Sequence, residues 1–182
     1  MYMNSNNHPG IMPYGDQMPR IHSSVYLAPG CHVIGDVEIG SNSSIWFNTV
    51  IRGDVHHIRI GRNTNIQDNS VCHVTTDKYP LLIGDRVTVG HMVNLHGCTI
   101  KDECLIGIGA IILDETIIGE QSFIAAGSLV TPRTAIPPRS FVRGHPARVI
   151  RSLDPREIEN IQWTASHYVE ICAKYKKSLN KT

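Results

Sequence analysis

Residues 105–130 read LIGIGAIILDETIIGEQSFIAAGSLV, and in this stretch an aliphatic side chain returns at every sixth position, from Ile106 to Val130. A helix repeats about every 3.6 residues and a half-buried strand about every 2 residues, so neither element explains this period. A short strand, a corner and a second short strand do explain it, because each strand then points one branched side chain inward. Such periods are typical of solenoids whose stacked coils bury one continuous core.

The same period covers most of the chain. The inward positions run through Val33, Ile39, Ile45, Ile51, Ile60, Ile66, Cys72, Ile83, Val89, Leu95, Ile100, Ile106, Ile112, Ile118, Ile124, Val130, Ile136 and Val142. The series predicts an all-β solenoid domain over residues 21–150, with about six coils if three strands make one coil, a number that the period itself does not fix. A β-sandwich is the alternative, but its strands recur about every 8 to 12 residues with an alternating pattern.

The two ends of the chain lack this period. Residues 1–20 are rich in Asn, Met, Pro and Gly, and we expect an N-terminal arm that lies loosely along the solenoid or a neighbour. In the C-terminal segment 151–182, Asp154, Pro155 and Glu157 form a helix-start pattern. The apolar residues that follow predict an amphipathic helix to about Lys177, covering a solenoid face or another subunit: Ile158, Ile161, Ala165, Val169 and Cys172.

Composition limits the function classes. The 182 residues are 41% hydrophobic with a net charge of +1. Their Lys and Arg residues form no basic stripe of the kind that binds nucleic acid, so we expect no nucleic-acid partner. The five cysteines form no spaced disulfide framework, which indicates a reducing compartment. The sequence also lacks a signal-peptide pattern and any stretch that approaches a membrane span. We therefore expect a cytoplasmic protein with no membrane partner.

Two histidines share one phase of the repeat. When the long steps after Ile51 and Cys72 are treated as loops, the strands led by Ile51, Cys72 and Leu95 fall on one face, and the second residues of these strands form a column: Arg52, His73 and His96. Adjacent strands lie about 4.8 Å apart. Two imidazole nitrogens on one zinc ion need only about 3.3 Å between them. His73 and His96 are therefore predicted to share a metal.

A third histidine has a different phase. His91 is the third residue of the strand led by Val89, on the preceding face, so it would have to reach around a corner of the prism. A threefold oligomer avoids this difficulty by laying the corner of one subunit against the flat face of the next. We therefore predict a homotrimer in which His73 and His96 of one chain and His91 of another hold an intersubunit metal. The alternative is that these histidines are solvated surface residues.

Several motifs around these histidines resemble the γ-class carbonic anhydrase-like proteins, from about Ile21 to the C-terminal helix. The matching stretches are 44–48 (SIWFN) with 52–54 (RGD), 65–69 (NIQDN) with His73, 90–91 (GH), 95–97 (LHG), 106–107 (IG), 126–128 (AGS) and 142–147 (VRGHPA). The histidine set with its neighbours is far more specific than the hexads, which unrelated acyltransferases share. The resemblance implies a left-handed triangular β-helix.

The resemblance also implies a chemistry. Three neutral imidazoles bind Zn²⁺, with Fe²⁺ as the alternative ion, and hydroxide on the metal converts CO2 to bicarbonate. Gln67 is expected to orient that hydroxide, and Asn65 to line the site. Arg52, Asp54 and Asp68 look like the ion-pair set of the subunit interface in this family. The alternative for those three residues is an ordinary surface ion pair.

The sequence departs from the family pattern at its acidic residues. Val55 stands where the archetypal active enzymes carry a glutamate, and the loop after His73 is a short stretch, 74–80 (VTTDKYP), with one acid. Losing both carboxylates removes the familiar proton relay and predicts weak hydration. His56 and His57 in the following loop, and Tyr168 on the predicted helix, are the candidate substitutes.

Other functions stay open. The first is an acyltransferase or acetyltransferase that uses a coenzyme A thioester, which is common chemistry for hexapeptide repeats but needs a single histidine base. The second is an acyl-thioesterase that uses the same metal, and the third is a non-catalytic scaffold with a structural metal. Fold alone cannot decide among them.

Overall fold

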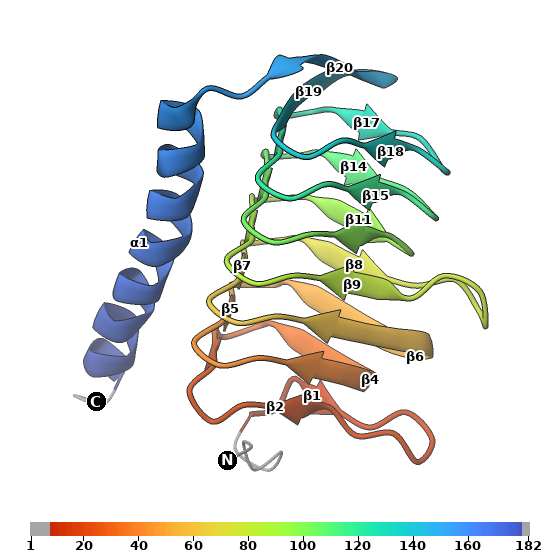
Figure 1. Cartoon of the computed structure of the whole chain (residues 1–182). Coiled ribbons are helices and arrows are strands. Elements are labelled where there is room, and N and C mark those ends of the chain that lie inside the picture. The colour runs from red at the N-terminus through yellow and green to blue at the C-terminus, as the bar shows by residue number, and fades with distance from the viewer. Residues whose placement is uncertain (1–7, 180–182) are drawn as a thin grey trace.

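The computed structural model describes residues 8–179, which form a β-solenoid of about seven turns with one helix at its side (Figure 1). Three flat faces run along the solenoid, and strands of successive turns pair in parallel within each face. The architecture confirms the predicted all-β solenoid and is consistent with a left-handed β-helix.

Face A is an eight-stranded sheet. Its strands are β3 (Tyr26–Leu27), β5 (Ser44–Ile45), β7 (Asn65–Ile66), β10 (Thr88–Val89), β13 (Leu105–Ile106), β16 (Phe123–Ile124), β19 (Ser140–Gly144) and β20 (Ala147–Ser152). The last strand, β20, pairs antiparallel with β19 and ends the solenoid at the top of Figure 1.

Faces B and C belong to one sheet because two long strands, β4 (His32–Ile39) and β6 (Val50–Ile60), run through both of them. Face B continues with β8 (Val71–His73), β11 (Asn94–His96), β14 (Ile111–Ile112) and β17 (Leu129–Val130). Face C continues with β9 (Leu81–Ile83), β12 (Thr99–Ile100), β15 (Ile117–Ile118) and β18 (Ala135–Ile136).

The turn count exceeds the predicted six because the chain adds a turn before Val33, the first position of the predicted series. Strands β1 (Ile11–Met12) and β2 (Arg20–Ile21) both pair with β4, and β3 pairs with β5. Residues 11–20, expected to be part of the arm, are thus attached to the solenoid by strand pairing. Residues 1–7 of the expected arm lie outside the described residues.

The predicted inward positions form the core. Ile51, Cys72, Leu95 and Ile112 on face B are each fully buried and follow one another in register from strand to strand. Burial raises the pKa of the Cys72 thiol to about 12, so this cysteine behaves as a small core residue. The core therefore fixes the register of the side chains that point outward from face B.

The corners between faces A and B repeat one backbone conformation. The third residue after each of five inward positions of face A, from Ile45 to Ile124, has a positive φ, in the order Asn48 (58°), Asn69 (59°), Met92 (57°), Gly109 (68°) and Gly127 (67°). Asparagine and glycine tolerate this left-handed conformation, whereas an unbranched apolar side chain such as Met92 adopts it rarely. Met92 is the exception in the column.

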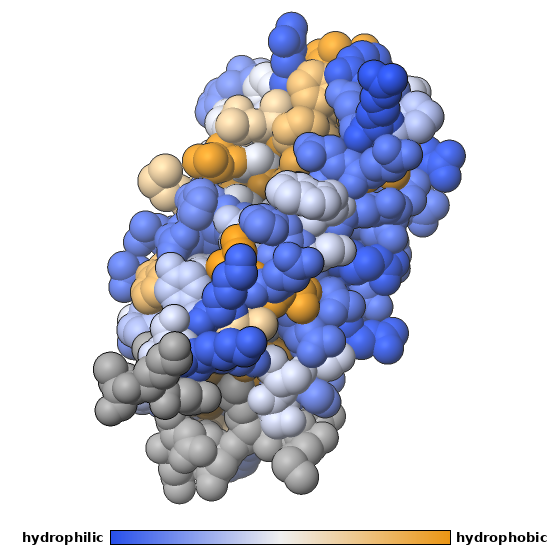
Figure 2. Space-filling view, turned by 90° about the vertical axis from the view of Figure 1, so that its left-hand side faces the viewer, coloured by the Kyte–Doolittle hydropathy of each residue, from blue (hydrophilic) through white to orange (hydrophobic). Residues whose placement is uncertain are grey.

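Helix α1 (Pro155–Leu179) begins with the predicted capping box. The Glu157 N–H donates to Asp154 Oδ1 and the Asp154 N–H donates to Glu157 Oε2, both at 3.0 Å. The helix covers face A, where Tyr168 and Tyr175 contact Trp46 edge-on at centroid distances of 5.5 and 5.2 Å. Figure 2 looks onto the side of the molecule where α1 lies; orange surface gathers toward its upper part, near the β19–β20 end.

The part of the chain that the structure describes includes no helix long and apolar enough to cross a membrane.

Candidate metal site

His73 and His96 lie side by side on face B, as their common phase predicts. They are register partners on β8 and β11, and His73 Nδ1 is 3.1 Å from His96 Nε2. Both rings are partly buried, with side-chain exposures of 19% and 32%. Two ring nitrogens at this separation match the spacing of about 3.3 Å that a shared tetrahedral metal requires.

Each of these rings uses its other nitrogen on a carboxylate. His73 Nε2 lies 3.0 Å from Asp54 Oδ1, and His96 Nδ1 lies 2.7 Å from Asp114 Oδ1. Because a carboxylate only accepts hydrogen bonds, both of these ring nitrogens must carry hydrogen. Neutral rings then direct two lone pairs at each other across 3.1 Å. Two facing lone pairs repel each other, and either a proton shared between the nitrogens or a metal ion bound to both removes that repulsion.

Arg52 completes this group, which we call the face half-site: Arg52, Asp54, His73, His96 and Asp114. The Arg52 guanidinium forms an ion pair with Asp54 Oδ2, the oxygen that does not face His73. Burial raises the pKa of Asp54, but the hydrogen bonds from Arg52 and His73 outweigh burial and leave the pKa below its usual value. Asp54 is thus a carboxylate that fixes the His73 ring.

His91 lies in the turn between β10 and β11, at the corner of faces A and B. Its Nδ1 is 2.7 Å from Asp68 Oδ2, while Asp68 Oδ1 accepts a hydrogen bond from the Phe47 N–H at 3.3 Å. The Asp68 carboxylate therefore holds the ring in the tautomer that leaves Nε2 free to accept or to bind a metal. The ring is 40% exposed.

Two amide side chains lie beside this corner on face A. Gln67 Nε2 donates to Asn65 Oδ1 at 3.0 Å, and Asn65 Nδ2 donates to Thr88 Oγ1 at 2.9 Å. Asn65 and Gln67 are both buried, and the Gln67 N–H pairs with the Val89 carbonyl two residues before His91. Gln67 thus reaches the His91 corner from the neighbouring turn, as the phase count predicts.

Tyr168 approaches the same corner from α1. Its ring packs against Trp46, and burial followed by the nearby Asp68 carboxylate raises the pKa of Tyr168. The hydroxyl is therefore protonated at neutral pH and is a hydrogen-bond donor beside the Asp68–His91 pair. We call this second group the corner half-site: Asn65, Gln67, Asp68, His91 and Tyr168.

The two half-sites do not meet within one chain. Among residues 8–179, no three His, Cys, Asp or Glu side chains are placed to hold one metal ion. Within the chain Asp54 pairs with Arg52 and Asp68 pairs with His91, so the predicted ion-pair set of the subunit interface stays a prediction. The chain therefore presents two separate groups of candidate ligands, on face B and at the corner of faces A and B.

Exposed apolar side chains accompany both half-sites. Val71 on β8 is 40% exposed and shares its strand with His73. Met92 and Ile108, in successive turns of the same corner, are 60% and 49% exposed. Apolar side chains that flank polar ligand groups are typical of a surface that meets a partner.

The candidate proton-relay residues take different positions. Val55 packs against the core and accepts the Asp77 N–H at 3.2 Å through its carbonyl. The His56 and His57 rings contact each other edge-on at 4.6 Å and line a hollow of about 230 Å³ that Asp54 also borders. Burial, Arg59 and His56 lower the pKa of His57. These rings thus lie near the face half-site, on its Asp54 side.

Asp114 is the member of the site that the sequence pattern does not reveal. It lies in the turn after β14, one coil beyond His96, within a stretch (112–118, ILDETII) that reads as an ordinary hexad and corner. The only available signal is its spacing of 18 residues from His96, the length of one coil without insertions. A search for acids one coil away from each histidine would find it.

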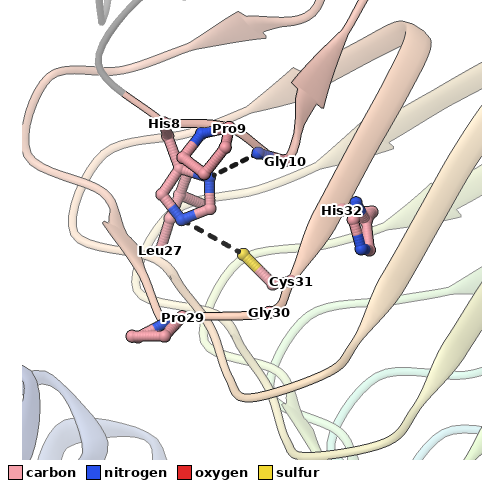
Figure 3. Close-up of a pocket in the computed structure, with 8 residues that line it drawn as sticks. All are labelled: His8, Pro9, Gly10, Leu27, Pro29, Gly30, Cys31 and His32. Carbon is pink, nitrogen blue, oxygen red and sulfur yellow. Dashed lines mark hydrogen bonds between the residues drawn. The ribbon is translucent and has the colours of Figure 1, made fainter.

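A separate pocket of about 410 Å³ lies at the N-terminal end of the solenoid (Figure 3). His8 Nε2 points at Cys31 Sγ across 3.9 Å, and His8 Nδ1 accepts the Gly10 N–H at 3.1 Å. Burial raises the pKa of the Cys31 thiol to about 12, so it is not a thiolate at neutral pH. His8 and Cys31 belong to neither half-site.

The chain is similar to hexapeptide-repeat transferases and to carbonic anhydrases. The family profile "Bacterial transferase hexapeptide (six repeats)" matches residues 18–53 and 97–132. A carbonic anhydrase of Geobacillus kaustophilus is 48% identical over 166 residues, which are 91% of this chain and 91% of that protein. The mitochondrial γ carbonic anhydrase 2 of Arabidopsis thaliana is 42% identical over 171 residues. That alignment covers 91% of this chain, which spans 62% of the plant protein's length.

A solved structure matches most of the chain. It is the BC4754 gene product of Bacillus cereus, provisionally described as an acetyltransferase, with a TM-score of 0.90 and 47% identity. The match covers 92% of this chain and 96% of the other. The identities and coverages together show that the chain belongs to the γ-carbonic anhydrase-like family of hexapeptide-repeat proteins.

Proposed function

We propose that the protein is a metal-dependent γ-carbonic anhydrase-like enzyme that catalyses reversible hydration of CO2, with Zn²⁺ or Fe²⁺ as its metal. One observation carries the proposal: His73 and His96 direct two ring nitrogens at each other across 3.1 Å, each ring fixed by its own carboxylate. The names of the relatives support the same activity. Imidazole ligands do not separate zinc from iron strongly, so the ion stays open.

The third ligand in this proposal comes from another subunit. A homotrimer would bring the corner half-site of one chain against the face half-site of the next, so that His91 completes the set begun by His73 and His96. The carboxylate partner of His91 and the exposed Met92 and Ile108 beside it support this arrangement. In the same interface, Arg52 and Asp54 of one chain would face Asp68 of the other and hold the register.

A metal ion held by three imidazoles supplies the Lewis acidity that makes water nucleophilic at neutral pH, which CO2 hydration requires. Gln67 is the residue proposed to orient the reacting water, because its amide is already held by Asn65 and keeps a second N–H for donation. Asn65 fixes Gln67. Tyr168 is proposed to donate a hydrogen bond from its protonated hydroxyl at the same corner.

Hydration also releases a proton that must leave the site, and here the chain lacks the family's usual carboxylates. The half-buried Val55 cannot accept a proton. His56 and His57 border a hollow that reaches Asp54 and are the proposed substitutes. We therefore expect hydration to be slow in weak buffer and to be accelerated by added imidazole.

The decisive experiment combines metal content with stopped-flow CO2 hydration on anaerobically purified protein. Wild type should hold about one metal ion per chain, and His91→Ala should lose both metal and activity. His32→Ala is the matched control, because His32 is exposed and lies outside both half-sites. Metal without hydration would redirect the proposal to another substrate or a structural role, and metal-free wild type would refute it.

A second candidate function is acyl transfer from a coenzyme A thioester, favoured by the description of the Bacillus cereus structure. Its close relation, metal-dependent thioester hydrolysis, would use the same histidines. Acetyl-coenzyme A turnover with and without an amine or alcohol acceptor separates these reactions. Turnover that survives complete metal removal would favour the transferase, because that chemistry needs only a histidine base.

A further inference from the structure

We propose that Asp114 is a positioning residue for the metal site. It fixes the His96 ring, Thr75 holds the Asp114 carboxylate, and Gly97 leaves the room that the carboxylate occupies. The inference rests on the proposed metal-dependent function. It is carried by one chain of contacts, in which His96 Nδ1 lies 2.7 Å from Asp114 Oδ1 and Thr75 Oγ1 donates to Asp114 Oδ2 at 3.1 Å.

The first contact decides which nitrogen of His96 can bind a metal. The carboxylate accepts the Nδ1 hydrogen, so the lone pair of the neutral ring lies on Nε2, the atom that faces His73. A histidine without such a partner can rotate or exchange tautomers. Carboxylates that hold a ligating histidine in this way are worth about 10- to 100-fold in metal affinity.

The second contact ties Asp114 to the loop that follows His73. Thr75 pairs with Tyr79 across this short loop, and its hydroxyl occupies the Asp114 oxygen that His96 does not use. The two ligands of the face half-site are thereby connected, because the loop leaves the strand of His73 and the carboxylate holds His96. Thr75 therefore sets the rotation of the Asp114 carboxylate.

Gly97 makes room for the carboxylate. A Cβ atom on Gly97 would overlap Asp114 Oδ1 and would lie 2.8 Å from Tyr79 Cβ. The residue also has a φ of +51°, which glycine adopts without strain. Its N–H donates to the His73 carbonyl at 3.0 Å, and its carbonyl accepts the Glu115 N–H at 2.8 Å. Any larger residue at position 97 would push Asp114 away from His96.

The test measures zinc affinity by competition with a chromophoric chelator. Asp114→Ala should bind zinc about 10- to 100-fold more weakly than wild type, whereas Glu115→Ala, an exposed acid in the same turn, should bind as wild type does. Asp114→Asn keeps an acceptor oxygen without the charge and should recover part of the loss. An Asn variant as weak as the Ala variant would assign the effect to charge and overturn the positioning role.

Thr75 and Gly97 give two further readouts. Thr75→Val should weaken zinc binding while Thr75→Ser restores it, because only the hydroxyl is needed. Gly97→Ala should weaken binding in wild type but add little to Asp114→Ala, since the displaced carboxylate is then already gone. Full additivity of those two changes would refute the role assigned to Gly97.

A measurement on metal-free protein separates this inference from the proposed function. Nitrogen-15 NMR of labelled histidine should find hydrogen on His96 Nδ1 in wild type, and a shift toward the Nε2–H form in Asp114→Ala. Thermal unfolding of each variant checks that the fold is kept. If wild type bound no zinc, the proposed function would fail while the tautomer result still stood; unchanged tautomer and affinity in Asp114→Ala would sink the positioning role alone.

Discussion

The face half-site is positioned by the register of a β-sheet, whereas the corner half-site is positioned by a turn and a helix. In the face half-site, sheet register places His73 beside His96, and inward Cys72 and Leu95 hold that register from the core. In the corner half-site, a turn places His91, and a helix from the far end of the chain brings Tyr168. The first is held by strand pairing with the turns on either side, while the second depends on a turn conformation and on helix docking.

This contrast means that the two half-sites should fail in different ways. Changes in the core are expected to disturb both, because every turn packs on its neighbours. Changes in corner conformation or helix attachment should disturb only the His91 side.

The strongest test of the comparison mixes two defective subunits. His73→Ala leaves the corner half-site intact, and His91→Ala leaves the face half-site intact. Each variant alone should lose more than about 100-fold in metal affinity, because removing only the carboxylate partner of a ligating histidine already costs up to that much. Refolded together in equal amounts, they should regain about one quarter of the sites, because half of the chains supply each intact surface. Metal content and hydration of the mixture are the measurements. No recovery in a mixture shown to contain mixed trimers would place the complete site within one chain.

Tyr168 tests whether the helix contributes chemistry or only packing. Tyr168→Phe removes the hydroxyl and keeps the ring that contacts Trp46, so we expect hydration to fall about 5- to 10-fold, the worth of one hydrogen bond, with unchanged zinc affinity. Steady-state hydration and chelator competition measure the two effects. An equal fall in Tyr175→Phe, which packs on the same tryptophan, would assign the loss to packing instead.

Met92 tests how much stability the left-handed backbone of the corner costs. Asparagine relieves a left-handed backbone that Met92 adopts with a φ of 57°, so Met92→Asn should stabilise the isolated subunit by up to about 1 kcal/mol. The same change removes an apolar side chain that is 60% exposed and should weaken trimer assembly. Chemical unfolding measures the expected gain in stability, and sedimentation at several protein concentrations measures the expected loss of assembly. Asn69→Asp, at the equivalent position one turn earlier, is the control for the corner.

Helix docking predicts the smallest effect, which depends on pH. Hydrogen bonds from Gln121 and Gln162, aided by Arg86, hold the pKa of Glu103 below its usual value of 4.5, and Gln162 belongs to α1. A lowered pKa means that the contribution of Glu103 to stability is complete above about pH 4.5 and is lost as the pH falls through the lower folded value. Glu103→Gln should therefore flatten the acid limb of the stability curve, measured by denaturant unfolding. Glu120→Gln, an exposed acid one coil away, should leave the limb unchanged.

The fold could be predicted because the six-residue period by itself shows which residues turn inward. Ile51, Cys72 and Leu95 each turn inward at the predicted phase, and the column of His73 and His96 follows from counting along the chain. The capping box of α1 likewise needs only four consecutive residues. The ligand roles of the three histidines and the homotrimer stay predictions.

The carboxylate partners could not be predicted in the same way. Which acid reaches which ring depends on side-chain rotation across turns. A spacing of one coil makes Asp114 a candidate partner of His96, but it does not show that the carboxylate turns toward the ring. The predicted series begins at Val33, although Ile21 and Leu27 continue it backward in six-residue steps and are buried. The irregular ten-residue step from Ile11 to Ile21 is what hides the first turn.

The stacking of turns also has a consequence for how this chain can change its length. Because the strands of each turn pair only with those of the turns above and below, a whole turn added beyond β17 would leave His73, His91 and His96 in place. The same addition would shift α1 along face A, so Tyr168 would keep its place at the corner half-site only if the connection to the helix changed as well. Insertions of other lengths can be absorbed only where the chain already leaves the prism, as it does at residues 74–80. Natural or designed variants of this scaffold should therefore grow in steps of one turn or at that loop, while the spacing between the histidines stays constant.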